Sequence, residues 1–162
     1  MNSSTTAATA LSARIGQEMG ASPWLQITQS QVTLFADAVH DWQFIHVDAQ
    51  RAALESPYGG TIAHGFLSLS LLTALSKGVL PQFTPSIEVN YGFDKVRFIT
   101  PVKTGARIRG RYTLSAFSWR SPQEFVARYA VVVEIEGEPR PALAADWIIM
   151  TTLLEQENEH SI

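Results

Sequence analysis

The chain has 162 residues, of which 46% are hydrophobic and 17% charged, and its formal net charge is −3 at pH 7. This length and composition predict one globular domain with a single core. The slight acidity gives no electrostatic reason to expect a nucleic acid or an anionic membrane as partner. The sequence contains no cysteine, which excludes disulfides, thiolate nucleophiles and cysteine-ligated metals. No apolar run reaches the roughly 18 residues that a transmembrane helix needs.

Both ends of the chain are polar. Its first dozen residues are small or polar and have neither the basic nor the apolar region of a secretory signal. We therefore expect a flexible N-terminal arm at residues 1–14, a single domain at 15–154, an acidic frayed tail at 155–162 and a cytoplasmic location.

Three helices are predicted in the first half of the chain. Thr28 and Gln31 fit a capping box, and the apolar residues that follow share one helical face as far as about Asp41. Asp48 is a second N-cap residue and begins a short helix. Leucines surround most of a third helix, at about 63–77, which predicts that it is buried on nearly all sides.

Long strands follow the helices. Val89, Tyr91 and Phe93 alternate with small or polar residues, and the alternation then changes parity, which predicts a bulge near Asp94 and Lys95. Three more strands are expected at about 106–116, 125–135 and 143–153. Helices followed by strands indicate an α+β fold, in which an antiparallel sheet wraps the apolar helix.

Asp41 and His46 lie five residues apart between two predicted helices, and Gly65 begins the leucine-rich helix. A paired acid and imidazole together with a backbone N–H donor provide what proton transfer beside a thioester carbonyl requires. A structural interpretation stands beside this one: Asp41 is then a solvated carboxylate at a helix end, and His46 a hydrogen-bonded loop residue. An isolated pair with this spacing is more often structural.

A metal site is a further alternative, because two histidines and a carboxylate suit non-haem iron. Its candidate ligands are His40, Asp41, His46, Asp48 and His64. None of these pairs has the i, i+4 helical spacing of a metal-binding histidine pair, so we expect no metal. On the residues alone, His64 is interpreted as a structural hydrogen-bonding residue at the helix start.

Two groups of side chains remain open to more than one interpretation. Arg107, Arg109 and Arg111 project from one face of a predicted strand, which is typical of a solvated outer face, although they could also contact coenzyme A phosphates. Trp42 and Phe44 either shape an acyl pocket or pack in a subunit interface.

Several motifs together resemble one known family. They are the segments DWQFIHVD at 41–48, SPYGGTIAHGFL at 56–67, NYGFDKVRF at 90–98 and PVKTG at 101–105. This pattern, over about residues 15–154, resembles the MaoC-like R-specific enoyl-CoA hydratases, and most of all the branch named after nodulation protein N. The resemblance implies a hot-dog fold, with an antiparallel sheet around a central helix, and a homodimer with its site near the subunit interface.

The resemblance also implies roles for individual residues. Asp41 and His46 would be the catalytic pair and the Gly65 N–H the oxyanion donor, while the substrate-binding positions would be Gln43, Ala63, His64 and Thr73. The chain departs from the usual family pattern at two places. His40 stands where glycine is usual, and Gln43-Phe44 replaces the more common Asn-Pro.

The implied activity is that of a lyase of fatty acid metabolism, which adds water reversibly to a trans-2-enoyl thioester of coenzyme A or acyl-carrier protein and gives the R-3-hydroxyacyl thioester. No cofactor is implied beyond the coenzyme A of the substrate. A hot-dog thioesterase and a non-catalytic acyl-thioester-binding subunit are the alternatives. The thioesterases typically carry a carboxylate on the central helix, whereas residues 65–75 contain no Asp or Glu.

Overall fold

The computed structural model describes residues 3–155. Along the chain the elements are α1 (Ser3–Ser12), β1 (Glu18–Ala21), β2 (Leu25–Gln26), α2 (Gln29–Val39), α3 (Phe44–Val47), α4 (Ala49–Glu55), α5 (Gly65–Ser70), α6 (Leu72–Leu75), β3 (Ser86–Phe98), β4 (Arg107–Trp119), β5 (Glu124–Ile135) and β6 (Leu143–Leu153). None of the helices in this part of the chain is both long and apolar enough to cross a membrane.

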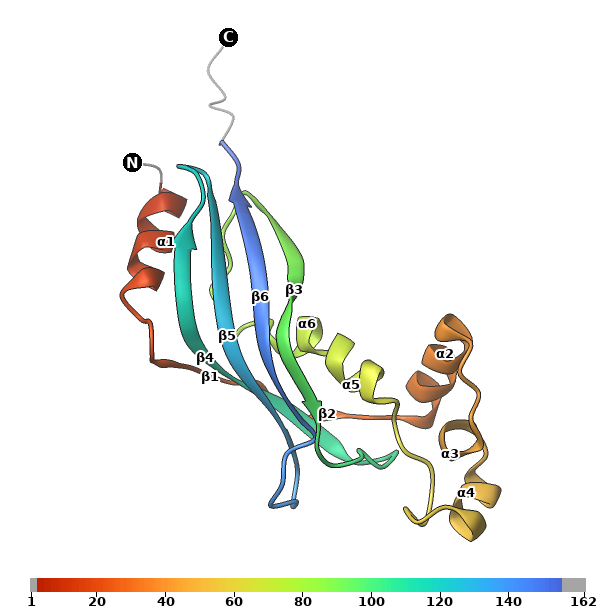
Figure 1. Cartoon of the computed structure of the whole chain (residues 1–162). Helices are drawn as coiled ribbons and strands as arrows, with labels where there is room; N and C mark the ends of the chain where they lie inside the picture. Colours follow the sequence, from red (N-terminus) through yellow and green to blue (C-terminus); the bar gives the residue numbers. More distant parts are fainter. Residues whose placement is uncertain (1–2, 156–162) are drawn as a thin grey trace.

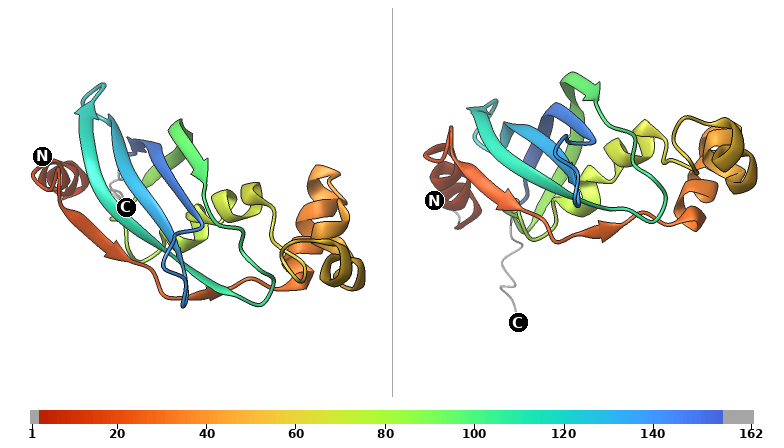
Figure 2. Two further views of the ribbon diagram at one scale, coloured as in Figure 1. Left: turned by 60° about the horizontal axis from the view of Figure 1, so that its bottom comes forward. Right: turned by 90° about the horizontal axis from the view of Figure 1, so that it is seen from below.

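The strands form one six-stranded sheet in the order β1-β4-β5-β6-β3, and β2 also pairs with β4 (Figure 1). All of these pairings are antiparallel. The sheet curves around α5 and α6, whereas α2, α3 and α4 lie together beyond the β3 side of the sheet (Figures 1 and 2). The predicted α+β arrangement is therefore confirmed.

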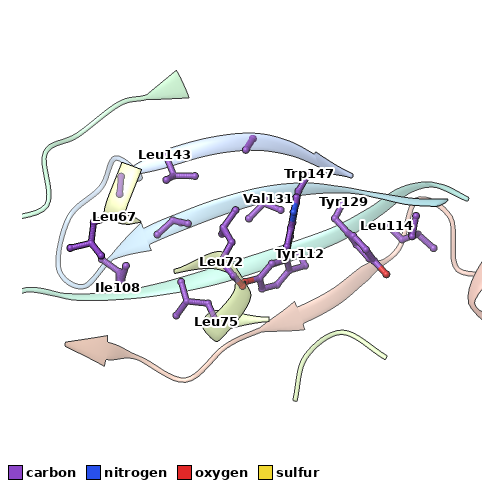
Figure 3. Close-up of a cluster of buried hydrophobic side chains, with 14 of the residues drawn as sticks. Leu67, Leu72, Leu75, Ile108, Tyr112, Leu114, Tyr129, Val131, Leu143 and Trp147 are labelled. Carbon is purple, nitrogen blue, oxygen red and sulfur yellow. The ribbon is translucent and has the colours of Figure 1, made fainter. Parts of the chain in front are cut away.

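The core lies between the concave face of the sheet and the α5–α6 segment (Figure 3). Leu67, Leu72 and Leu75 supply the helical side of this core. The sheet side comes from residues that alternate along the strands, since every second side chain of a strand points to the same face. They include Ile108, Tyr112, Leu114, Tyr129, Val131, Leu143 and Trp147.

The local predictions of helix starts and of the bulge are confirmed. Thr28 and Gln31 form both hydrogen bonds of a capping box at the start of α2. The Asp48 side chain accepts a hydrogen bond from the Arg51 N–H and caps α4. The register of β3 shifts between Phe93 and Lys95, as expected, and a second shift occurs between Asn90 and Gly92.

The leucine-rich helix differs from its prediction in two ways. It is interrupted at Leu71, so that α5 and α6 are two short helices. It is also not buried on nearly all sides, because Phe66, Ser70 and Thr73 are exposed, Phe66 by 68%. The prediction was wrong because six to ten residues of helix on one curved sheet can bury only the face that meets the sheet.

The first residues of the chain also differ from expectation. Residues 3–12 form α1 rather than a flexible arm, and Ala8 and Leu11 are 0% and 3% exposed within the core. The apolar side chains of Ala8 and Leu11 pack α1 onto the protein, which composition alone did not reveal. The short strands β1 and β2 were not predicted. Nearly all of the tail expected at 155–162 lies outside the described residues.

Candidate active site

The segment that carries Asp41 and His46 turns sharply after α2. His40 caps that helix in the left-handed conformation, with φ of 58°. Asp41 follows, and its Oδ1 accepts a hydrogen bond of 3.3 Å from the Gln43 N–H. Gln43 is the N-cap of α3, the short helix that holds His46. Two local turns therefore bring the carboxylate and the imidazole to the same side of the chain.

His46 is buried, and its environment determines which ring nitrogen is free. Nδ1 lies 2.7 Å from the carbonyl oxygen of Ile62. Because a carbonyl can only accept, Nδ1 carries the hydrogen and Nε2 of the neutral ring keeps its lone pair. Burial lowers the pKa of His46 below its ordinary value of 6.5, and the hydrogen bond to Ile62 only partly opposes that effect. The arrangement favours a neutral imidazole with a basic Nε2.

His64 lies directly against His46. The two rings stack with their centroids 3.7 Å apart and an interplanar angle of 23°. Nε2 of His64 donates to the backbone oxygen of Asp41 over 3.0 Å, and it lies 3.9 Å from Oδ2 of the same residue. Nδ1 of His64 is buried and has no partner among the described residues. His64 thus ties the start of α5 to the Asp41 turn, which agrees with the structural role expected from the residues alone.

The three side chains converge on one point. A carboxylate oxygen of Asp41, a ring nitrogen of His46 and a ring nitrogen of His64 all lie within 4.8 Å of one another. A water with hydrogen bonds of about 2.8 Å fits between two groups at such a separation. The same set could approach a metal, but Nε2 of His64 would then lose its bond to the Asp41 oxygen, and Nδ1–H would be buried without an acceptor. The hydrogen bonding of this structure suits a shared water better.

A hollow of about 290 Å³ lies beside His46, and we call it the dyad hollow. It is lined by His46, Ile62, Ala63, Gly65, Ser68, Phe98, Ile99, Thr100, Pro101, Val102 and Ala142. The Gly65 N–H begins α5 and has no acceptor among the described residues. A Cβ on Gly65 would come within 2.9 Å of the Phe98 ring, so the close approach of that ring requires glycine here.

The structure places the other predicted substrate-binding positions unevenly. Ala63 lines the dyad hollow. His64 does not line it but stacks against the ring of His46, which does. The Gln43 side chain is exposed and does not line the hollow. Thr73 lines a different cavity, of about 480 Å³, on the open face of α5 and α6. Sequence reasoning did not single out Ser68, which does line the dyad hollow. Its polarity within a leucine-rich helix, one turn after Gly65, was the available signal.

Arg107, Arg109 and Arg111 of β4 lie on the outer face of the sheet. Arg107 pairs with Glu136, while Arg109 and Arg111 both bind Glu134 and Arg111 also binds Glu18. Every second residue of this part of β4 is therefore an arginine because its side chain pairs with a glutamate of a neighbouring strand or turn on the solvated face of the sheet. Trp42 and Phe44 do not line the dyad hollow. The Trp42 indole donates to Asp37, and the Phe44 ring lies under Arg51.

Comparison with known proteins gives matches over most of the chain. Residues 10–134 match the model of the MaoC like domain. The chain belongs to the MaoC-like family. It is 56% identical to nodulation protein N of Rhizobium leguminosarum bv. viciae over 136 residues, which are 83% of this chain and 84% of that protein. It is 42% identical to 3-hydroxyacyl-thioester dehydratase Z of Mycobacterium tuberculosis over 139 residues, which are 86% of this chain and 91% of that protein.

A solved R-hydratase structure has the same fold. The R-hydratase PhaJ1 from Pseudomonas aeruginosa, in its unliganded form, superposes with a TM-score of 0.64 at 25% identity and covers 91% of this chain and 92% of that one. The antiparallel sheet wrapped around α5 and α6 is therefore the hot-dog fold. Both the resemblance to this family and the expected fold are confirmed.

Proposed function

We propose that this MaoC-like protein is a hydratase that adds water reversibly to trans-2-enoyl thioesters and forms R-3-hydroxyacyl thioesters. The observation that carries the proposal is the convergence of the Asp41 carboxylate and the His46 imidazole within 4.8 Å, beside a hollow that exposes the Gly65 N–H. Similarity to a 3-hydroxyacyl-thioester dehydratase and to an R-hydratase supports the same reaction.

In the proposed reaction, Asp41 and His46 hold one water between them. As the water oxygen bonds to C3 of the enoyl group, one of its protons passes to Nε2 of His46. The electrons of the double bond move toward the thioester, and the resulting enolate-like oxygen is stabilised by the Gly65 N–H. The protonated pair then returns a proton to C2, which completes the addition of one water.

The electrostatics of the site support these roles. A general base works best when its unprotonated form is present at the operating pH. The lowered pKa of His46 keeps the imidazole neutral around neutral pH. The hydrogen bond from Nδ1 to Ile62 directs Nε2 away from the protein backbone. Asp41 is about half exposed, so water and substrate can reach its carboxylate.

One assay tests the proposal against its two alternatives. The purified protein is given a chain-length series of trans-2-enoyl thioesters, each offered once as the coenzyme A thioester and once as the acyl-carrier-protein thioester. Enoyl absorbance and free thiol are followed together. Loss of absorbance without thiol release supports the hydratase. Thiol release would instead indicate a thioesterase, and binding without either change would indicate a non-catalytic thioester-binding subunit.

We further propose that the active form is a homodimer. The open face of α5 and α6 and the free edge of β3 both carry apolar side chains, among them Phe66, Ile87, Val89 and Tyr91. An exposed edge strand with apolar side chains is a template for pairing with another chain. Two-fold symmetric dimers are also the most common oligomers.

A further inference from the structure

One hydroxyl of the dyad hollow has no role in the chemistry described so far. Ser68 is 3% exposed and lines the hollow together with His46 and Gly65. Its Oγ makes no hydrogen bond to the described part of the chain. The hydroxyl is not among the fully buried side-chain atoms that lack a partner, so it opens onto the hollow, where a ligand can reach it.

Two other serines of this segment behave differently. Ser70 Oγ donates to the carbonyl oxygen of Leu67 over 2.9 Å, and Ser76 Oγ donates to that of Thr73 over 3.1 Å. Such bonds to the preceding turn are the usual way in which a helical serine is satisfied. The carbonyl of His64, one turn before Ser68, receives only the Ser68 backbone N–H. The hydroxyl of Ser68 is therefore left available to the hollow.

The helix geometry orients this hydroxyl. Ser68 follows Gly65 by three positions, so both lie on the same face of α5, about 4.5 Å apart along the axis. Side chains of a helix lean toward its N-terminus, which brings the Ser68 hydroxyl over the turn that begins at Gly65. Thr100 also brings a hydroxyl to the hollow, but it is only half-buried and within reach of solvent.

We propose that Ser68 is a further catalytic residue, whose hydroxyl donates a hydrogen bond to the carbonyl oxygen of a bound thioester. This inference rests on the proposed function, because that reaction brings the carbonyl oxygen into the hollow beside His46. The hydroxyl strengthens its bond as the oxygen gains negative charge, and so acts with the Gly65 N–H. The site would therefore bind acyl thioesters, and it would recognise their carbonyl group as well as their acyl chain.

The test combines turnover with binding of two unreactive ligands. Butyryl-CoA keeps the thioester carbonyl, whereas S-butyl-CoA is the thioether that lacks it, and calorimetry gives the dissociation constant of each. We expect Ser68→Ala to lower kcat for crotonyl-CoA by about 10² or more, as loss of an oxyanion donor does. It should weaken butyryl-CoA binding roughly 2- to 12-fold and leave S-butyl-CoA binding unchanged.

Ser70→Ala is the matched control, because it removes a hydroxyl from the same helix that already has a protein partner. It should leave turnover and both dissociation constants near those of the unmodified protein. Ser68→Cys keeps the size of the side chain with a weaker donor and should fall between the serine and alanine forms. Thermal melting checks that each variant is folded.

The outcomes separate this inference from the proposed function. If the unmodified protein binds butyryl-CoA but hydrates no member of the enoyl chain-length series, the hydratase proposal fails, and the selective effect of Ser68→Ala on butyryl-CoA still supports the hydroxyl as a carbonyl donor. Equal weakening of both ligands, or no change in either, would overturn the role of Ser68. Both proposals would be overturned if the unmodified protein neither binds nor hydrates any member of the chain-length series, as coenzyme A or as acyl-carrier-protein thioester.

Discussion

The imidazole rings of His46 and His64 stack 3.7 Å apart in a buried position, and they are held by different backbone oxygens. Ile62 receives the hydrogen of His46, and Asp41 receives that of His64. Two stacked imidazoles cannot both become charged without mutual repulsion. Burial first, and then the proximity of His64, therefore lower the pKa of His46.

This pKa predicts the pH dependence of turnover. Hydration needs neutral His46, and because its pKa is below 6.5, the base is lost only as the pH falls through that lowered value. The acid limb of kcat/KM should have a midpoint below 6.5. The same shift makes the unfolded chain bind the proton first, so the free energy of unfolding should decrease as the pH falls from 6.5 to the lowered pKa. NMR titration of the ring and a pH–rate profile are the measurements. An acid limb at 6.5 or above would contradict the role of His46.

The Asp41–His46 pair should behave as a unit. Asp41→Asn and His46→Gln should each lower kcat by roughly 10²–10⁴, because either change removes one group that holds the shared water. The double variant should be little worse than the single ones. His40→Asn is a control, since asparagine tolerates the left-handed conformation of this neighbouring residue. Near-normal kcat in either single variant would show that the pair is not catalytic.

Gly65 should not accept a side chain without a shift of its neighbours. Gly65→Ala places a Cβ within 2.9 Å of the Phe98 ring, so either the ring moves in the dyad hollow that it lines, or α5 moves and displaces the Gly65 N–H. We expect kcat to fall by about tenfold or more, because an oxyanion donor acts only at its correct position. Gly60→Ala is the matched control, since nothing lies within 4 Å of a Cβ there. Phe98→Ala added to Gly65→Ala should restore part of the activity, and the steric explanation would be refuted if it restores none.

The β3 edge should be needed for the dimer. Val89→Glu puts a charge on an apolar edge residue that is 43% exposed, and we expect this change to give monomers with reduced turnover. Val132→Glu is a matched control on the central strand β5, where the valine is 36% exposed. Sedimentation velocity at micromolar concentration measures both. A stable and fully active monomer of the unmodified protein would remove the dimer proposal.

The product should be the R alcohol, formed by syn addition. Asp41 and His46 come from one segment and hold one water, so oxygen and proton reach the same face of the enoyl plane. Crotonyl-CoA hydrated in deuterated water and analysed by NMR gives the relative configuration. An S-specific 3-hydroxyacyl-CoA dehydrogenase should consume almost none of the product. Substantial consumption would mean that the pair faces the other side of the substrate.

Features that depend on neighbours along the chain follow from the amino-acid sequence alone. Thr28 and Gln31 cap α2 because their spacing places each side chain over the other's backbone N–H. Asp48 caps α4 for the same reason, and the parity change near Asp94 predicted the bulge of β3. The motif around Asp41 and His46 likewise pointed to the family, because its residues are consecutive.

Features that join distant parts of the chain could not be predicted in this way, because they depend on the folded arrangement. Ile62 selects the free nitrogen of His46 across 16 positions, and no local pattern encodes that contact. The interruption of the long helix at Leu71 was not encoded in its leucine pattern, nor was the placement of Ser68 at the dyad hollow and of Thr73 at another cavity. The burial of Leu11 likewise depends on a surface supplied by other elements, so a polar segment read alone resembled a loose arm. Spacing fixes hydrogen bonds within a turn, whereas long-range packing fixes which groups meet across the fold.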